Sequence, residues 1–439
     1  MNLEKYQNNL ESARDVGQQM YRFAQELFPI CRSITGNGVR QTLKLIQSYL
    51  PEMQIFEVPS GETCLDWTVP FEWNIKDAYV KNSTGRRVID FKANNLHLVN
   101  YSEPVSKKIS LEELQKNLHS LPDQPDAIPY ITSYYNRTWG FCLTHNDRLR
   151  LKPDQYEVFI DSSLEKGSLT YGEVFLPGES EKEIFLSTYI CHPSMGNNEV
   201  SGPVLTAFLG QWIKQKKRRY SYRLVFVPET IGAIVYIDKN LESLRKKVFG
   251  AYQITCVGDD RDYSFLPSRL GGTVTDKITT HVMNRLVPGY KNYSFADRGS
   301  DERQYCSPGV DLPMVSVMRS KYATYPEYHT SLDNLDLISA SGFEGSFNVY
   351  TRCLELFEEN RKFQVTCIGE PQLGKRGLRP TLGTKDMAAR VRNMANVLAF
   401  SDGNHDLVDI AELLGVDALD LAPLAQKLRE ADLLRLADE

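Results

Sequence analysis

The chain has 439 residues, of which 41% are hydrophobic and 24% charged, and its formal net charge is -5. This length exceeds what one hydrophobic core usually holds, so two or three domains are expected. The mildly acidic balance disfavours nucleic acid as a partner, because phosphate groups bind to basic surfaces.

The amino end and the cysteine pattern favour a cytoplasmic protein. The first residues have no secretory signal pattern, and no apolar stretch approaches the length that spans a membrane. The eight cysteines are scattered without close pairs, which is typical of free thiols in a reducing compartment. We therefore expect neither a membrane anchor nor a disulfide framework.

Two helices and a strand open the chain. Apolar residues recur at helical spacing between residues 15 and 50, and the polar loop 32–38 interrupts them. A strand follows over 52–59. The pattern then changes to short alternating runs such as 92–100, with one helix over 110–119. These runs predict a small inserted domain that is mostly β.

From residue 135 onward, strands alternate with helices. The apolar runs 183–190, 222–227 and 250–257 predict strands, and helices are expected over 203–216 and 231–240. Such alternation is typical of a mostly parallel sheet with helices on its faces. The fold class expected from this region is therefore α/β.

Three of the apolar strands lead into residues that can carry chemistry. His192 follows the strand 183–190, Glu229 follows the strand 223–227, and His329 comes soon after the strand 312–320. In open α/β sheets, ligands bind beyond the carboxyl ends of the strands. The three side chains are therefore expected to meet at one edge of the sheet.

Cys191, next to His192, has two interpretations. It could be a nucleophile, but a reactive thiol needs exposure and a lowered pKa. Its position at the end of a buried strand favours a packed thiol instead. Two other histidines, His97 and His119, lie in the β-rich region and are interpreted as packing or surface residues.

The last part of the chain reads as a separate helical module. A linker rich in glycine and proline spans 369–384, and helices are expected over 385–399, 407–414 and 419–431, followed by the short apolar segment 433–436. Three helices and a short strand suggest a winged helix.

The charge of this module argues against DNA. From Val397 onward it has ten acidic and three basic residues, and an acidic surface repels phosphates. We expect the module to contact protein instead, either the catalytic domain or a second subunit in a homo-oligomer.

Four motifs give the chain a family resemblance that covers nearly its whole length. It resembles the α/β zinc aminopeptidases and, more closely, their aminopeptidase-like relatives found in bacterial polysaccharide-biosynthesis loci. The matching segments, in the right order, are Cys191-His-Pro-Ser-Met-Gly-Asn-Asn-Glu-Val-Ser-Gly202, Pro228-Glu-Thr-Ile-Gly232, Gly299-Ser-Asp-Glu-Arg303 and His329-Thr-Ser-Leu-Asp333. The resemblance implies an aminopeptidase-like catalytic domain over 1–59 and 135–365, an inserted β-rich domain over 60–134, and a winged helix over 380–439.

The resemblance also implies a metal site. In the aminopeptidases, two zinc ions share a bridging aspartate, each ion has one histidine and one further carboxylate, and a neighbouring glutamate is the general base. By motif position, His192 and His329 would be the ligand histidines and Glu229 the base. A metal lowers the pKa of bound water, and the base takes up the proton.

The sequence departs from the family at the acidic ligands. The bridging aspartate is replaced by Asn198, which Glu199 follows, and Thr230 and Thr255 stand at the two other carboxylate positions. Neutral residues weaken the case for two ions, because divalent ions need anionic ligands. We therefore expect one zinc, held by His192, Glu199 and His329, with two zinc ions as the alternative.

Further residues complete the expected site. The family's carboxylate that orients the first histidine is replaced by Ser194, so Asp333 is expected to support the ligands from behind, together with Asn198. Candidates for binding the substrate are Arg319, Tyr325 and Asp301. Other acids near the same edge could be ligands or solvated loop charges: Asp259, Asp260, Glu302 and Glu327.

The function expected from these features is zinc-dependent hydrolysis of an amide or peptide bond. The substrate could be a peptide, an amino-sugar amide or a peptide-linked saccharide, because the resembling relatives belong to glycan loci. The loss of three acidic ligands leaves a second hypothesis open. The chain could be a metal-free, inactive peptidase fold that serves as a binding or assembly module in polysaccharide biosynthesis.

Overall fold

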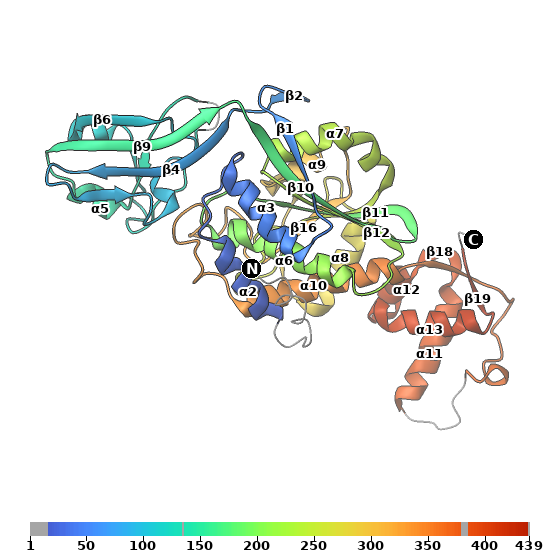
Figure 1. The fold of residues 1–439 in the computed structure, drawn as a ribbon. Coiled ribbons are helices and arrows are strands. Elements are labelled where there is room, and N and C mark those ends of the chain that lie inside the picture. Colours follow the sequence, from blue (N-terminus) through green and yellow to red (C-terminus); the bar gives the residue numbers. More distant parts are fainter. Residues whose placement is uncertain (1–15, 134–135, 379–384, 438–439) are drawn as a thin grey trace. The chain divides into compact units, whose positions relative to one another are not determined.

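The computed structural model describes residues 16–133, 136–378 and 385–437. The chain divides into two compact units: Met1–Gly271 with Lys291–Phe347, and Gly272–Tyr290 with Asn348–Glu439 (Figure 1). None of the helices in the described part of the chain combines the length and hydropathy needed to cross a membrane.

An eight-stranded mixed sheet forms the centre of the first unit (Figure 1). The four strands β12, β11, β13 and β16 run parallel, and antiparallel pairs flank them. In spatial order the strands are β1 (Gln54–Pro59), β10 (Ser168–Leu176), β12 (Tyr220–Val227), β11 (Ser180–Tyr189), β13 (Val248–Gln253), β16 (Met314–Met318), β14 (Ser264–Leu266) and β15 (Lys291–Asn292).

The central position of β11 follows from its sequence. Residues 183–190 are all buried, so this strand has no solvent-facing side. A continuous apolar run is typical of a parallel strand that is covered on both faces. The predicted α/β class with a largely parallel core is confirmed.

Helices cover both faces of the sheet (Figure 1). On one face, α2 (Val16–Leu27), α3 (Asn37–Tyr49) and α6 (Ser201–Ile213) pack together, and α6 contacts β11 and β12. On the other face, α7 (Ile231–Lys247) contacts the central strands and α9 (Glu302–Tyr305), which lies against β16. The helix α10 (Ala340–Glu359) runs from the first unit into the second.

The inserted region builds a second sheet in the first unit (Figure 1). Its antiparallel strands are, in spatial order, β5 (Arg87–Asp90), β4 (Glu72–Lys81), β9 (Gln155–Glu165) and β6 (Val105–Ser110). The change of pattern near residue 134 does not mark the end of this sheet, because the long strand β9 returns to pair with β4 and β6.

Two local predictions in the insertion were wrong. The run 92–100 is a turn with the 3-10 helix η1 (Asn95–His97), because the Asn94 side chain accepts the backbone N–H of Leu96 and caps that turn. The expected helix 110–119 is only α4 (Leu111–Gln115). The chain then forms β7 (Leu118–His119), which pairs with β8 (Phe141–Cys142).

Short elements complete the first unit. They are β2 (Thr63–Cys64), β3 (Trp67–Thr68), α5 (His145–Arg150), η2 (Gly196–Val200) and η3 (Phe295–Asp297). His97 Nδ1 forms a hydrogen bond of 2.7 Å with the carbonyl oxygen of Cys142, which is the packing role expected of it.

The second unit contains a winged helix. Its strands pair in the order β18 (Asp402–Asp406), β17 (Lys362–Val365) and β19 (Leu434–Leu436), and its helices are α11 (Lys385–Phe400), α12 (Leu407–Leu414) and α13 (Ala418–Glu430). Between them lies η4 (Gly374–Arg376), and part of the expected linker, 379–384, falls outside the described residues. Because β17 begins at Lys362, this sheet starts well before residue 380.

The helix α8 (Val274–Leu286) also belongs to the second unit. Lys277 Nζ lies 2.7 Å from both Asp406 Oδ2 and Asp409 Oδ1, at the start of α12. Two acidic residues of the module therefore already have a basic partner within their own unit, although α8 precedes them by more than a hundred residues.

Candidate active site

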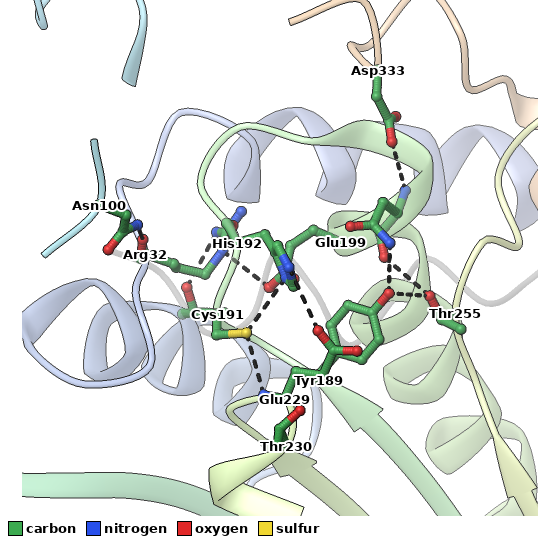
Figure 2. Close-up of polar contacts among 12 residues, drawn as sticks. Arg32, Asn100, Tyr189, Cys191, His192, Glu199, Glu229, Thr230, Thr255 and Asp333 are labelled. Atoms are coloured by element: carbon green, nitrogen blue, oxygen red, sulfur yellow. Dashed lines mark hydrogen bonds and ion pairs between the residues drawn. The ribbon is translucent and has the colours of Figure 1, made fainter. Parts of the chain in front are cut away.

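The three residues expected at the strand ends come together in the first unit. His192 follows β11, Glu229 follows β12, and His329 lies in the loop beyond β16. His192 Nε2 is 3.6 Å from Glu229 Oε2, and the rings of His192 and His329 are 5.2 Å apart between centroids. Figure 2 shows His192 and Glu229 at this edge of the sheet.

Glu199 lies behind His192. Its Oε2 is 2.9 Å from Nδ1 of His192 (Figure 2). Because a carboxylate can only accept a hydrogen bond, Nδ1 is the donor. The other ring nitrogen, Nε2, faces Glu229. Burial lowers the pKa of His192, but the hydrogen bond and charge of Glu199 outweigh it and raise the pKa overall. Glu199 thus orients the histidine, as carboxylates behind metal-binding histidines do.

Arg32 is a member of the site that the sequence analysis missed. It is 1% exposed, its Nε donates to the carbonyl oxygen of His192 at 3.0 Å, and the same nitrogen lies 3.4 Å from Glu199 Oε1. Nη1 donates to the carbonyl oxygen of Leu27 at 2.8 Å. A single arginine in a polar loop between two amphipathic helices was the only signal for it in the sequence.

Asn198 and Thr255, two of the neutral residues at the expected carboxylate positions, share hydrogen bonds with Tyr189. Asn198 Nδ2 donates to the hydroxyl of Tyr189 at 2.7 Å, and that hydroxyl is 2.6 Å from Thr255 Oγ1. Thr255 Oγ1 in turn donates to the carbonyl oxygen of Asn198 at 3.0 Å (Figure 2). This closed chain of hydrogen bonds links Asn198, Tyr189 and Thr255 without any added positive charge.

Asp333 supports the turn that carries Asn198. It accepts the backbone N–H groups of Asn197 at 2.6 Å and Asn198 at 3.0 Å, in the single π-helical turn η2. The Tyr325 hydroxyl also donates to Asp333, at 2.8 Å. Burial raises the pKa of Asp333 to about 6 in spite of these bonds. The group that orients His192 is therefore Glu199, and Asp333 positions the backbone beside it.

The turn after β12 holds Glu229 at the edge of the sheet. The Glu229 side chain is 18% exposed, and burial raises its pKa above the usual value. Thr230 has a φ of 63°, a left-handed conformation that is rare for this residue type, and its N–H donates to Asp301 Oδ1 at 2.7 Å. Strained residues held by their surroundings cluster at functional sites.

The three residues expected to bind substrate have other partners. Asp301 is fully buried and accepts the N–H of Thr230, and Tyr325 bonds to Asp333. The guanidinium of Arg319 lies 3.8 Å from the ring centre of Tyr263 and 3.8 Å from Asp260. All three are nine-tenths buried or more, so the structure commits them to holding the loops around the site.

The remaining acidic candidates are bound by neighbouring groups. Asp259 accepts bonds from Asn197 and Ser320, Asp260 from Ser339 and Ser341, Glu302 from Gly299 and Tyr322, and Glu327 from Arg261. Burial also raises the pKa of the Cys191 thiol well above its usual value, and this sulfur accepts the N–H of Glu229 at 3.2 Å. Both observations support the interpretation of Cys191 as a packed thiol.

The centre contains buried nitrogen and oxygen atoms of the kinds that bind divalent ions. His329 Nε2 and Asn198 Oδ1 are buried and have no hydrogen-bond partner among the described residues. Burial and the charge of His192 lower the pKa of His329 to about 3, so its ring is neutral, as a metal ligand must be. The donor atoms of Cys191, His192 and Glu199 also lie within 4.8 Å of one another, but Glu199 Oε2 is already bonded to His192 Nδ1, and Glu199 Oε1 lies 3.4 Å from Arg32 Nε.

Comparison with known families covers almost the whole chain. Residues 21–360 match a family model described as a domain of unknown function (DUF4910), and residues 361–436 match a winged helix-turn-helix model. The second match agrees with the winged helix that the structure shows in the second unit.

A protein of Clostridium acetobutylicum is 45% identical over 436 residues, which cover 99% of this chain and all of that protein. Its provisional name is a polysaccharide biosynthesis protein with an aminopeptidase-like domain. A crystal structure from the same organism, described provisionally as a peptidase, has a TM-score of 0.92 and 44% identity over 99% of this chain and 100% of the other.

Distant solved structures share the fold of the α/β part of the chain. A zinc aminopeptidase from Bacillus subtilis has a TM-score of 0.57 and 10% identity over 78% of this chain and 94% of its own. A peptidase M28 precursor from Shewanella amazonensis has a TM-score of 0.54 and 12% identity over 79% and 96%. The chain therefore belongs to the DUF4910 family, with an aminopeptidase-like α/β domain followed by a winged helix.

Proposed function

We propose that the protein is a zinc-dependent amide hydrolase of the aminopeptidase type. The observation that carries this proposal is the pair of the buried His192 and the half-buried His329 at the end of the parallel strands, with Glu229 beside His192. The aminopeptidase-like fold supports the proposal, because ligands of open α/β sheets bind beyond the carboxyl ends of the strands.

His192 Nε2 and His329 Nε2 would hold the ion. Asn198 Oδ1 would be the third ligand in place of Glu199, which the sequence predicted, because Glu199 Oε2 is bonded to His192 Nδ1. Bound zinc would lower the pKa of a water molecule and polarise the carbonyl of the amide. Glu199 keeps the proton of His192 on Nδ1, so that Nε2 has a lone pair available for the ion. Arg32 balances the charge of Glu199 and keeps that carboxylate in place.

Glu229 is the proposed general base. It is the partly exposed carboxylate next to His192 Nε2, so it can reach a water molecule at the centre. A raised pKa moves it closer to neutral pH, where a base that accepts and later returns a proton is most effective. Its backbone is fixed by the bond from its N–H to Cys191 Sγ.

We propose a single zinc rather than two. The second ion of a paired site would need anionic ligands, but Asn198, Thr230 and Thr255 are neutral. Asn198 Nδ2 and Thr255 Oγ1 are also occupied by Tyr189 and by the Asn198 carbonyl. The site as folded thus has little negative charge to hold a second ion.

The proposed substrate is an amide of an amino sugar or a peptide-linked saccharide. Support comes from the relative of Clostridium acetobutylicum, whose provisional name refers to polysaccharide biosynthesis. The missing acidic ligands favour one alternative, a metal-free protein that binds or assembles polysaccharide-biosynthesis components.

Metal content separates these two functions. Protein prepared without chelators is expected to contain about one zinc per chain by elemental analysis. His192→Ala and His329→Ala should each lose it while staying folded by circular dichroism. His281→Ala, in the second unit, is the matched control and should keep it. Wild-type protein that takes up no zinc would support the metal-free binding function instead.

Glu229→Gln tests the role of the base. The amide has the shape of the carboxylate but cannot accept the proton, so turnover of a cleaved amide should fall by roughly 10²- to 10⁴-fold. Zinc content should stay at the wild-type level in this variant. Loss of the metal would instead make Glu229 a ligand, and unchanged turnover would remove it from the mechanism.

A further inference from the structure

We propose that the inserted domain completes the site: its arm, residues 124–133, holds the His329 loop in place, and Tyr130 on this arm determines which groups reach the two histidines. For its consequence in catalysis, this inference rests on the proposed function. The contacts that support it do not depend on zinc.

The arm is bound along the loop 326–331, about two hundred residues away in the chain. Tyr130 N–H donates to the carbonyl oxygen of His329 at 2.8 Å. Ile128 and Ser331 exchange two bonds, from Ser331 N–H to the Ile128 carbonyl at 2.8 Å and from Ile128 N–H to Ser331 Oγ at 3.0 Å. Gln124 Nε2 donates to the carbonyl oxygen of Pro326 at 2.9 Å.

The arm is also fixed to the body of the insertion. Asn100 N–H donates to the carbonyl oxygen of Ile131 at 2.8 Å, and Ser133 N–H donates to that of Asn100 at 3.0 Å. Asn100 is itself bonded through Nδ2 to the carbonyl oxygen of Arg32 (Figure 2). The arm therefore connects the loop of His329 with the segment that supports Glu199 and His192.

His329 needs such support because its backbone is strained. Its φ is 55°, in the left-handed region that residues other than glycine rarely adopt. A conformation of this kind costs about 1–3 kcal/mol and persists only when its surroundings impose it. The bond from Tyr130 N–H to the His329 carbonyl, and the two bonds between Ile128 and Ser331 just after it, provide that constraint.

The ring of Tyr130 lies against both histidines. Its centroid is 5.1 Å from that of His192 and 5.3 Å from that of His329, which it meets edge-on at 83°. Tyr328 stacks on His329 at 3.9 Å. Tyr130 and Tyr328 are both half-buried, so neither residue is fully enclosed by the fold. Aromatic walls of this kind favour an apolar face on the ligand, such as a sugar ring or an aliphatic side chain.

Chemical modification of the histidines tests this inference without a substrate. Diethyl pyrocarbonate modifies neutral imidazole rings that it can reach, and mass spectrometry gives the rate at each histidine. In metal-free full-length Tyr130→Ala, His329 should react several-fold faster than in the wild type. Tyr130→Phe keeps the ring and should match the wild type. The exposed His405, far along the chain, is the internal reference in every sample.

The hold of the arm on the His329 loop is tested by Ser331→Ala, which removes the acceptor for Ile128 N–H. It should speed modification of His329 less than Tyr130→Ala does. Equal rates at His329 in the wild type and in folded Tyr130→Ala would overturn the inference. If Tyr130→Ala does not fold, Tyr130→Leu takes its place and must show the same increase.

A second measurement separates this inference from the proposed function. On zinc-loaded protein, Tyr130→Ala should lose zinc to EDTA faster than Tyr130→Phe. Wild-type protein that binds no zinc would end the proposed function, while the modification rates would still decide whether Tyr130 covers His329. A zinc-binding protein with unchanged rates in both assays would end the inference alone.

Discussion

Two regions of this chain bury a histidine beside a glutamate, and they use it differently. In the first unit, His192 is 2% exposed and donates from Nδ1 to Glu199, with Nε2 left toward Glu229. In the second unit, His281 is 1% exposed, its Nδ1 is bonded to Glu412, and its Nε2 accepts the N–H of Ala418 at 3.0 Å.

The difference lies in the second ring nitrogen and in the glutamate. Both nitrogens of His281 are used by the fold, and Glu412 is 51% exposed, where water and Arg285 satisfy it. Glu199 is 1% exposed and relies on Arg32 for its counter-charge. The two histidines are equally buried, and they differ in whether the fold uses Nε2: it does in His281, whereas in His192 this nitrogen faces Glu229.

The largest expected effect comes from removing Arg32. Arg32→Met leaves the buried Glu199 without its cation, which should lower the free energy of unfolding by about 3–5 kcal/mol in urea titrations. Lys277→Met is the control in the second unit. Lys277 is 32% exposed and pairs with Asp406 and Asp409, so its loss should cost about 1 kcal/mol or less.

A double variant identifies the cause. Arg32→Met with Glu199→Gln removes both charges and should recover most of the stability that the single variant loses. If the double variant is as unstable as Arg32→Met, the loss comes from packing or from the bonds of Arg32 to Leu27 and His192, and not from the unpaired charge.

The next effect is a pH dependence caused by His329. Its pKa is about 3 in the folded protein against about 6.5 in an unfolded chain. Between these values the unfolded chain takes up a proton that the folded protein does not, so the stability contributed above pH 6.5 is lost as the pH falls.

Replacement of His329 by Asn should remove this dependence. Between pH 7 and pH 4, metal-free wild-type protein should lose about 1–3 kcal/mol more stability than His329→Asn in urea titrations. Above pH 7 the stability difference between the two should stay constant. A difference that does not change between pH 7 and pH 4 would show that His329 is as easily protonated in the folded protein as in the unfolded chain.

The smallest expected effect concerns the second region. The winged helix should show no measurable binding to duplex DNA in a gel-shift assay at physiological salt. The buried side of α13 is apolar, and the only basic residues of α13 are Lys427 and Arg429 in its last turn. Binding that weakens steeply with salt would show phosphate contacts and would give this region a ligand of its own.

The sequence predicted the fold class and the three central residues because these depend on local patterns. The run 183–190 could only be a strand covered on both faces, and the ends of parallel strands meet at one edge. The order of the four motifs then predicted His192, Glu229 and His329 together. The packed thiol of Cys191 followed from the same strand.

Only the tertiary structure decided how these residues are used. Glu199 follows Asn198 in the chain, but the π-helical turn η2 directs its carboxylate to His192 Nδ1, whereas Asp333 binds the turn itself. The strand β9 and the helix α8 likewise pair with partners that their sequence neighbours do not indicate.

The same reason explains why Arg32 and Tyr130 were not predicted. Arg32 contacts a residue 160 positions away, and Tyr130 contacts the loop of His329 about two hundred positions away. Hydrophobic periodicity reports which side of an element is buried, so it predicts strands, helices and the residues at their ends. It does not predict which distant polar group contacts a buried charge or a strained loop. Those contacts form only when segments that are far apart in the sequence pack together.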